Sequence, residues 1–224
     1  PNLLFMDGDG NLIHRSAGYK DSTEFISLGK TAQTPDKTFA FIQKQYDSGN
    51  TNPAFISEYL NFLSHSCLPA NDAAIKYFIN VKENEMMLPA NWGILRDYVE
   101  DVQSTPFGYL VKNRKEYALK YTTDSVNDKI FTVYLNKCYK LIYQKNFDST
   151  AIINFKKEID KTGFERNEEL HLSIDLPCYE RSGSWDSYYN TCKTLVEKYK
   201  QNDGGFLNNV SWTIFEKSND KTQL

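Results

Sequence analysis

The residues that most constrain the fold of this chain lie at its start, where a short apolar run meets a turn-forming cluster. Leu3 to Met6 form a continuous apolar run, typical of a strand buried on both faces. The segment Asp7 to Asn11 contains two glycines, and its aspartate and asparagine residues tolerate the positive φ values of a tight hairpin turn. Residues 12–15 resume an extended pattern that stops at Gly18. The sequence therefore predicts a β-hairpin.

A helix signal follows the hairpin. Asp21 or Ser22 can serve as the N-cap, and Glu24 stands in the first turn. Phe25, Ile26 and Leu28 supply an apolar face. The predicted order of elements is strand, hairpin turn, strand and helix.

That order, with a proline at its start, resembles the closing half of a thioredoxin-like domain, in which the last hairpin and the last helix follow a cis-proline. The residues that carry the resemblance are Pro1 to Met6, Gly10 to Arg15, Ala17 to Tyr19 and Asp21 to Lys30. The resemblance places Pro1 at the cis-proline position, with Asn2 where thioredoxins usually have threonine.

The resemblance implies a bacterial thiol-disulfide oxidoreductase or disulfide-isomerase-like protein that acts outside the cytoplasm, in the periplasm. The redox centre of that family, a Cys-x-x-Cys pair, precedes the proline and has no counterpart among the four cysteines here. We therefore expect no catalytic residue, cofactor or metal in this chain, which looks truncated at both ends. Its expected role is a helical interaction and support module for protein or peptide partners.

Charge and hydropathy exclude two other classes. Twenty-six basic and twenty-nine acidic residues give a net charge of -3, which does not suggest a nucleic-acid partner. No apolar run approaches the roughly 20 residues that a membrane-spanning helix requires. The compartment cannot be read from this composition.

A polar stretch from Ala32 to Asp36, which contains Pro35, predicts a domain boundary after residue 33. Residues 1–33 would be the thioredoxin-like remnant, and residues 34–224 an all-helical domain. Apolar stripes at helical spacing recur in that second part. The predicted helices cover residues 39–46, 53–67, 73–81, 88–102, 105–121, 130–142, 147–159, 170–182, 185–199 and 206–215.

About nine such helices of roughly 10 to 16 residues, joined by short turns, predict an array of antiparallel helix pairs. The turn at Gly183 to Trp185 resembles that of a tetratricopeptide-like pair, although no strict repeat period is present. Leu170 to Leu176 alternate apolar and polar residues, a pattern that by itself indicates a strand. We still predict a helix there, because a lone strand among helices would have no partner.

The alternative hypothesis for function is enzymatic. Leu3 to Leu12 also resemble the first motif of haloacid-dehalogenase-type phosphatases, in which Asp7 would be the nucleophile and Asp9 the general acid and base. Asn11 replaces the usual threonine, and no later strand ends in paired acidic residues to hold magnesium. We favour hairpin-turn roles for both aspartates, and Asp7→Asn would test the alternative in an aryl phosphate assay.

The same turn departs from an EF-hand loop, because Leu12 stands where glycine is needed and Gly18 where the bidentate glutamate is needed. His14, His65 and His171 are far apart in sequence, so no metal site is predicted.

The fifteen tyrosines leave two interpretations open. They can fill helix interfaces, which we favour, or line a groove that grips a peptide or glycan.

The cysteines are predicted to be mostly inert. Cys67, Cys138 and Cys192 fall on apolar helix faces, where a thiol is usually a small buried hydrophobic group. A Cys178–Cys192 disulfide would need to span an offset of about 6 Å along a helix pair, which disfavours it. Cys178 follows Pro177, which could start a helical turn. Cys178 is therefore the one cysteine that we consider a candidate for a reactive thiol. The apolar strand from Leu3 to Met6 should also lead either to self-association through the hairpin or to local disorder of it.

Overall fold

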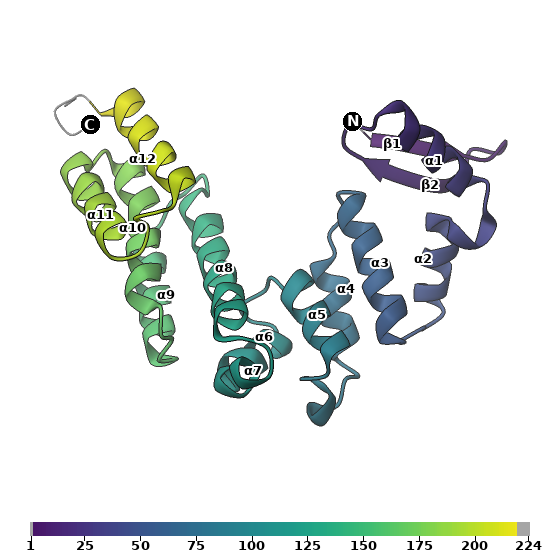
Figure 1. The fold of residues 1–224 in the computed structure, drawn as a ribbon, viewed down its shortest axis with the longest axis horizontal. Coiled ribbons are helices and arrows are strands. Elements are labelled where there is room, and N and C mark those ends of the chain that lie inside the picture. The colour runs from purple at the N-terminus through teal and green to yellow at the C-terminus, as the bar shows by residue number, and fades with distance from the viewer. Residues whose placement is uncertain (1, 219–224) are drawn as a thin grey trace. The chain divides into compact units, whose positions relative to one another are not determined.

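The computed structural model describes residues 2–218 and divides the chain into two compact units, Pro1–Leu110 and Val111–Leu224 (Figure 1). The cis-proline position assigned to Pro1 lies outside the described residues. The boundary predicted after residue 33 falls inside the first unit, and it remains a prediction.

The described chain is mainly helical, with twelve α-helices and one small antiparallel sheet of two strands. The elements of the first unit are β1 (Asn2–Met6), β2 (Leu12–Ala17), α1 (Ser22–Ala32), η1 (Pro35–Lys37), α2 (Phe39–Asp47), α3 (Pro53–His65), α4 (Asn71–Phe78), η2 (Glu83–Glu85), α5 (Pro89–Tyr98) and α6 (Thr105–Lys112), the last spanning the division. Those of the second unit are α7 (Arg114–Lys120), α8 (Thr123–Ile142), α9 (Ser149–Lys161), α10 (Asn167–Ser182), α11 (Trp185–Lys198) and α12 (Gly204–Lys217).

The predicted number and lengths of the helices were wrong. The described helices run from seven residues in α7 to twenty in α8. The helix expected over residues 105–121 is two helices, α6 and α7, which are separated at Asn113. Both helices share the same apolar periodicity, so the break between them cannot be detected in the hydrophobic pattern.

The predicted hairpin is confirmed. β1 and β2 pair antiparallel, with Leu3 opposite Ser16 and Phe5 opposite His14. The Asp7 carboxylate closes the turn, because it accepts hydrogen bonds from the backbone N–H groups of Asp9 (3.0 Å) and Asn11 (2.8 Å) and from the Asn11 side-chain amide (2.9 Å). These bonds hold the pKa of Asp7 below its usual value. Gly10 adopts a φ of 85°, which a residue with a side chain rarely adopts.

Asp21 is the N-cap of α1, and it forms a full capping box with Glu24. The Asp21 side chain accepts a hydrogen bond from the Glu24 N–H (2.8 Å), and the Glu24 carboxylate accepts one from the Asp21 N–H (3.1 Å). This reciprocal pair fixes the start of the helix. The predicted choice between Asp21 and Ser22 is thereby decided.

The prediction that β1 is buried on both faces was wrong. Leu4 is 51% exposed and Met6 is 55% exposed, whereas Leu3 and Phe5 on the other face are partly buried. The sheet has only two strands, so β1 has one hydrogen-bonded neighbour and one covered face. A continuous apolar run identified the strand correctly, but its number of neighbours is a property of the whole fold.

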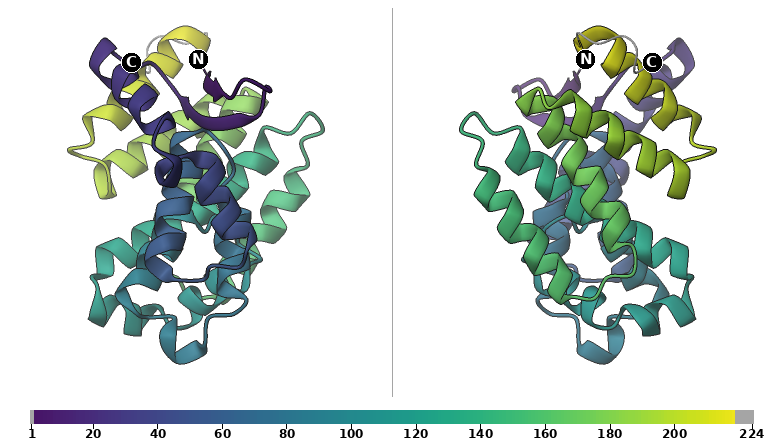
Figure 2. Two further views of the ribbon diagram at one scale, coloured as in Figure 1. Left: turned by 90° about the vertical axis from the view of Figure 1, so that its right-hand side faces the viewer. Right: turned by 90° about the vertical axis from the view of Figure 1, so that its left-hand side faces the viewer.

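The helical assignment of residues 170–182 is confirmed by α10. Leu170, Ile174 and Leu176 are buried in it, and the helix packs against α8, α9 and α11. Contact on several sides explains why apolar residues alternate along a helix here. Gly183 follows in the left-handed region with a φ of 70°, and α11 lies beside α10 in both side views (Figure 2).

The second unit has a buried cluster formed by α10, α11 and α12. Its members are Leu176, Tyr188, Cys192, Leu195, Val210 and Ile214. Each of the three helices contributes an apolar stripe to this cluster, as the periodicity predicted. The tetratricopeptide-like arrangement of such pairs remains a proposal.

Candidate functional site

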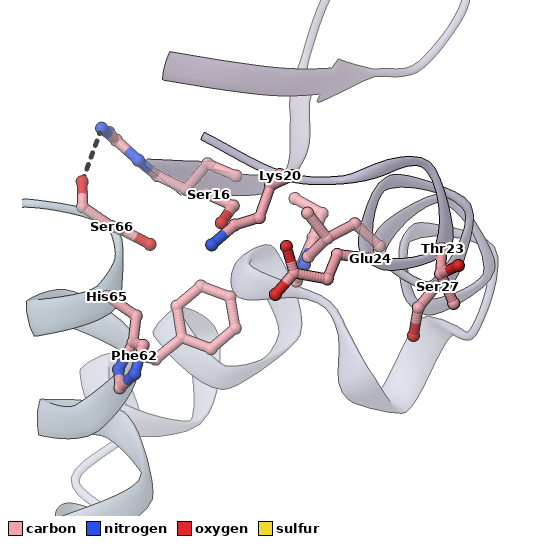
Figure 3. A pocket seen from close by; sticks show the side chains of 11 residues that line it. Ser16, Lys20, Thr23, Glu24, Ser27, Phe62, His65 and Ser66 are labelled. Carbon is pink, nitrogen blue, oxygen red and sulfur yellow. Dashed lines mark hydrogen bonds between the residues drawn. The ribbon is translucent and has the colours of Figure 1, made fainter. Parts of the chain in front are cut away.

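A cavity in the first unit lies between β2, α1 and α3 (Figure 3). Its volume is about 480 Å³, within the range of small-molecule sites. The residues that line it are His14, Arg15, Ser16, Lys20, Thr23, Glu24, Ser27, Leu28, Phe62, His65 and Ser66. We call this space the β2–α3 pocket.

His14 forms the buried end of the pocket and links β2 to α2. Its Nδ1 accepts a hydrogen bond from the Phe39 N–H at 3.2 Å, which places the ring proton of the neutral imidazole on Nε2. The ring meets Phe62 edge-to-face, with 5.2 Å between ring centroids. Burial lowers the pKa of His14 below its usual value of 6.5, because the charged form is poorly solvated there.

This environment makes the first unit sensitive to acid. His14 is neutral in the folded protein, whereas the unfolded chain takes up a proton near pH 6.5. The stabilisation is therefore present above about pH 6.5 and is lost progressively as pH falls through the lowered pKa. We expect the His14 ring to titrate below 6.5 by NMR, and the first unit to lose stability between pH 7 and 5. His14→Asn keeps an acceptor but cannot be protonated, so it should flatten this pH dependence; an unchanged dependence would contradict the assignment.

Two cations face the pocket without an acidic partner among residues 2–218. Arg15 donates from Nη2 to the Ser66 carbonyl at 3.2 Å, and its Nε is buried with no hydrogen-bond acceptor in the described structure. Lys20 extends toward the space above the Phe62 ring, close to Glu24 in the same view (Figure 3). Glu24 already accepts the Asp21 N–H in the capping box. The pocket therefore has a small excess of positive charge.

Exposed apolar side chains lie on both β1 and α1. Leu4 and Met6 are exposed on β1, and Phe25 (49% exposed) and Ile26 (58% exposed) on α1. No residue of α1 is buried, although the helix is amphipathic. Phe25 packs beside Phe5, with 6.2 Å between ring centroids, whereas Leu4 and Met6 lie on the opposite face of β1. We call the exposed side chains Leu4, Met6, Phe25 and Ile26 together the hairpin–helix surface.

The structure shows the environment of each of the four cysteines. All four cysteines are free, so the disfavoured Cys178–Cys192 disulfide is not formed. Burial raises the pKa of Cys138 and of Cys192 to about 12, and burial also raises the pKa of Cys178. Such thiols carry almost no thiolate near neutral pH.

Two details of the cysteine predictions were wrong. Cys67 is exposed, and it lies in the left-handed turn after α3 with a φ of 51°, not on an apolar helix face. That position ends the helix, because the following Leu68 N–H bonds back to the Leu63 carbonyl at 2.8 Å. Pro177 does not start a helix, since it lies inside α10, so Cys178 lacks a helix N-terminus to stabilise its thiolate.

Of the three histidines, His14 and His65 both line the β2–α3 pocket, whereas His171 lies on α10. Among residues 2–218, no group of three or more histidine, cysteine or acidic side chains could hold a metal ion. Asp7 is engaged in the hairpin turn, and its partner in the phosphatase hypothesis, Asp9, stands in the same turn rather than at the edge of a larger sheet. Both aspartates therefore have the turn roles that we favoured.

Many tyrosines fill the interior. The buried ones are Tyr59, Tyr77, Tyr117, Tyr134 and Tyr188. Tyr59 donates its hydroxyl hydrogen to the Gln43 side chain (2.9 Å), and Tyr77 donates to Asn91 (2.5 Å). Buried rings with bonded hydroxyls support the interface interpretation over a tyrosine-lined groove.

Sequence reasoning missed the β2–α3 pocket. Arg15 and Ser66 are 51 residues apart, and neither belongs to a recognisable motif. The only local signal was the start of a helix near Lys20 and Glu24, which indicated a helix cap and not a cavity.

No described helix is long and apolar enough to cross a bilayer.

The comparisons with known proteins return no relative. No protein-family model, no curated protein and no solved structure matches this chain. The thioredoxin-like resemblance therefore depends only on the residues of the hairpin and α1.

Proposed function

We propose that this chain is a non-enzymatic interaction module of a thioredoxin-like thiol-disulfide exchange protein. The observation that carries the proposal is the hairpin–helix surface, since α1 is amphipathic but buries no residue, and β1 beside it leaves Leu4 and Met6 in solvent. Large apolar side chains left exposed on one small unit support an interaction role.

The backbone of β1 favours an extended strand as the occupant. Among the described residues β1 pairs only with β2, so its second edge is free to accept another strand. Residues 2–6 contain no charged residue and no proline, the usual devices that protect an edge from pairing. Addition of a partner strand at this edge would also cover Leu4 and Met6.

The helices from α2 onward would then support the hairpin and present it to its partner. The raised pKa values of the buried thiols support an absence of redox chemistry in this part of the protein. By the resemblance, the whole protein would exchange disulfides in the periplasm. A second copy of this chain is the partner on which the proposal can be tested directly.

Self-association provides that test. In an antiparallel pairing of two β1 edges about Leu4, Leu3 of one copy would lie opposite Phe5 of the other, with no charge repulsion. We expect concentration-dependent association by sedimentation velocity, and protection of residues 2–6 in hydrogen exchange. Leu4→Lys should weaken the association at least about tenfold, because it introduces a charge into an apolar contact.

Leu119→Lys is the matched control, since Leu119 is 90% exposed on α7, outside the hairpin. It should leave the association unchanged. A synthetic peptide of residues 2–7 provides a second probe, because it presents the same strand without the rest of the chain. If the protein stays monomeric at millimolar concentration and the peptide gives no protection of β1, the strand-pairing proposal is wrong.

A further inference from the structure

We propose that the β2–α3 pocket binds a small amphipathic organic anion, in which a carboxylate is joined to an apolar body. The pocket is distinct from the hairpin–helix surface, and the inference does not depend on the proposed interaction function. It follows from four features of the pocket: an apolar floor, cations without an acidic partner, serine hydroxyls in the wall, and size.

The floor of the pocket is apolar and held in place. Phe62 contributes a ring that packs against His14 at 5.2 Å and against Phe39 at 5.5 Å between centroids. Leu28 adds an aliphatic side chain from α1. Because His14 is held neutral by burial and its Nδ1 is bonded to the Phe39 N–H, its ring presents a largely apolar wall. An aryl or short alkyl group fits this floor better than a fully polar ligand does.

The charged groups favour an anion. Neither Arg15 nor Lys20 forms an ion pair in the described part of the chain, and Glu24 is the only carboxylate in the lining. One Glu24 oxygen already accepts the Asp21 N–H, so this carboxylate is partly occupied by the helix cap. A ligand carboxylate would therefore meet two cations against one acid, in a site partly shielded from solvent.

Two buried serines supply further hydrogen-bonding groups. Ser16 is 7% exposed and Ser66 is 1% exposed, but neither hydroxyl oxygen is a buried atom without a partner among residues 2–218. Both hydroxyls point toward the pocket interior (Figure 3). A serine hydroxyl at the wall of a cavity can donate a hydrogen bond to an acceptor such as a carboxylate oxygen. The buried, unpaired Nε of Arg15 adds a third donor beside them.

The volume limits the ligand to a small molecule. A cavity of about 480 Å³ accommodates a group of the size of a phenylalkyl carboxylate. A compound with about twelve heavy atoms should bind with a dissociation constant on the order of 0.1 to 1 mM. Weak binding of this kind is measurable by calorimetry and by NMR.

The test compares 4-phenylbutyrate with 4-phenylbutan-1-ol and with inorganic phosphate. The first two compounds share the apolar body and differ in charge, whereas phosphate has charge without an apolar body. We expect saturable binding of 4-phenylbutyrate, with NMR shifts confined to residues 14–16, 20–28 and 62–66. The alcohol should bind at least about tenfold more weakly, and phosphate should not compete.

Variants then locate the site. Lys20→Gln removes one cation at a partly exposed position, so we expect it to weaken 4-phenylbutyrate binding about five- to tenfold without unfolding the protein. Lys30→Gln is the matched control, because Lys30 is exposed on the same helix but does not line the pocket. Circular dichroism of both variants checks that the fold is retained.

Each remaining outcome overturns the proposal. No saturable binding of 4-phenylbutyrate, or shifts outside the pocket, would refute the site. If the alcohol bound as tightly as 4-phenylbutyrate, the negative charge of the ligand would have no role in recognition. If phosphate competed effectively, the apolar body of the ligand would not be needed for binding. Equal affinities of Lys20→Gln and Lys30→Gln for 4-phenylbutyrate would show that the cations of the pocket do not contribute to its recognition.

Discussion

Replacing Leu195 with alanine is expected to destabilise the second unit by about 2 to 5 kcal/mol, the range typical of a leucine-to-alanine change in a packed core. Leu195 is fully buried on α11, within the cluster that α10, α11 and α12 form together. The shortened side chain leaves a cavity that three helices cannot close without losing their other contacts. Chemical denaturation followed by hydrogen exchange of α10 and α11 amides would measure the loss in this unit.

The matched control is Leu119→Ala, because Leu119 is 90% exposed on α7 in the same unit. It should change the free energy of unfolding by less than about 0.5 kcal/mol. The contrast isolates burial, since both variants remove the same atoms. Equal effects of the two variants, or a Leu195→Ala effect below about 1 kcal/mol, would mean that the cluster is not a core.

Thiol reactivity should differ by more than about a thousandfold among the four cysteines. With a pKa of about 12, Cys138 and Cys192 carry roughly one thiolate in ten thousand molecules at pH 8, and both side chains are buried. Cys67 is exposed, so alkylation of the native protein should modify it first. Cys178 should follow more slowly, and Cys138 and Cys192 only on unfolding. Mass spectrometry of a time course would assign each site.

The same thiol environment predicts no insulin reduction above the uncatalysed rate with dithiothreitol as the electron source. Dithiol exchange needs an exposed thiolate with a resolving cysteine nearby, and the exposed Cys67 has none in a Cys-x-x-Cys spacing. Cys67→Ser should abolish the fast alkylation and leave the insulin result unchanged. Turnover that disappears in Cys178→Ser would overturn both the inertness of the thiols and the proposed non-enzymatic role.

Local features of the fold could be predicted because the interactions that produce them join neighbours in sequence. The capping box of Asp21 and Glu24 joins residues three apart, and the Asp7 turn bonds span at most four. Gly163 and Gly183 take left-handed conformations just past the ends of α9 and α10, a position at which glycine is common for local steric reasons. Such signals survive in a single sequence because they need no knowledge of distant partners.

Periodicity alone was insufficient where a segment has many neighbours or few. The alternation from Leu170 to Leu176 matched a strand, but α10 is covered on several sides, so several of its faces carry apolar residues. The run from Leu3 to Met6 matched a buried strand, but β1 pairs with β2 alone and exposes Leu4 and Met6. In each case the sequence determined which residues of the element are apolar. The number of elements that contact it determined how many of those residues are buried.

The sequence by itself determined the hairpin, the start of α1, most of the helices and the absence of a Cys-x-x-Cys centre. Only the tertiary structure decided which surfaces stay exposed and where a cavity forms. The β2–α3 pocket joins Arg15, Lys20 and Ser66 from three separate segments, and the Arg15–Ser66 bond closes 51 residues of chain. Contacts between residues so far apart in sequence depend on how whole elements pack. They therefore cannot be predicted from a local pattern of residues.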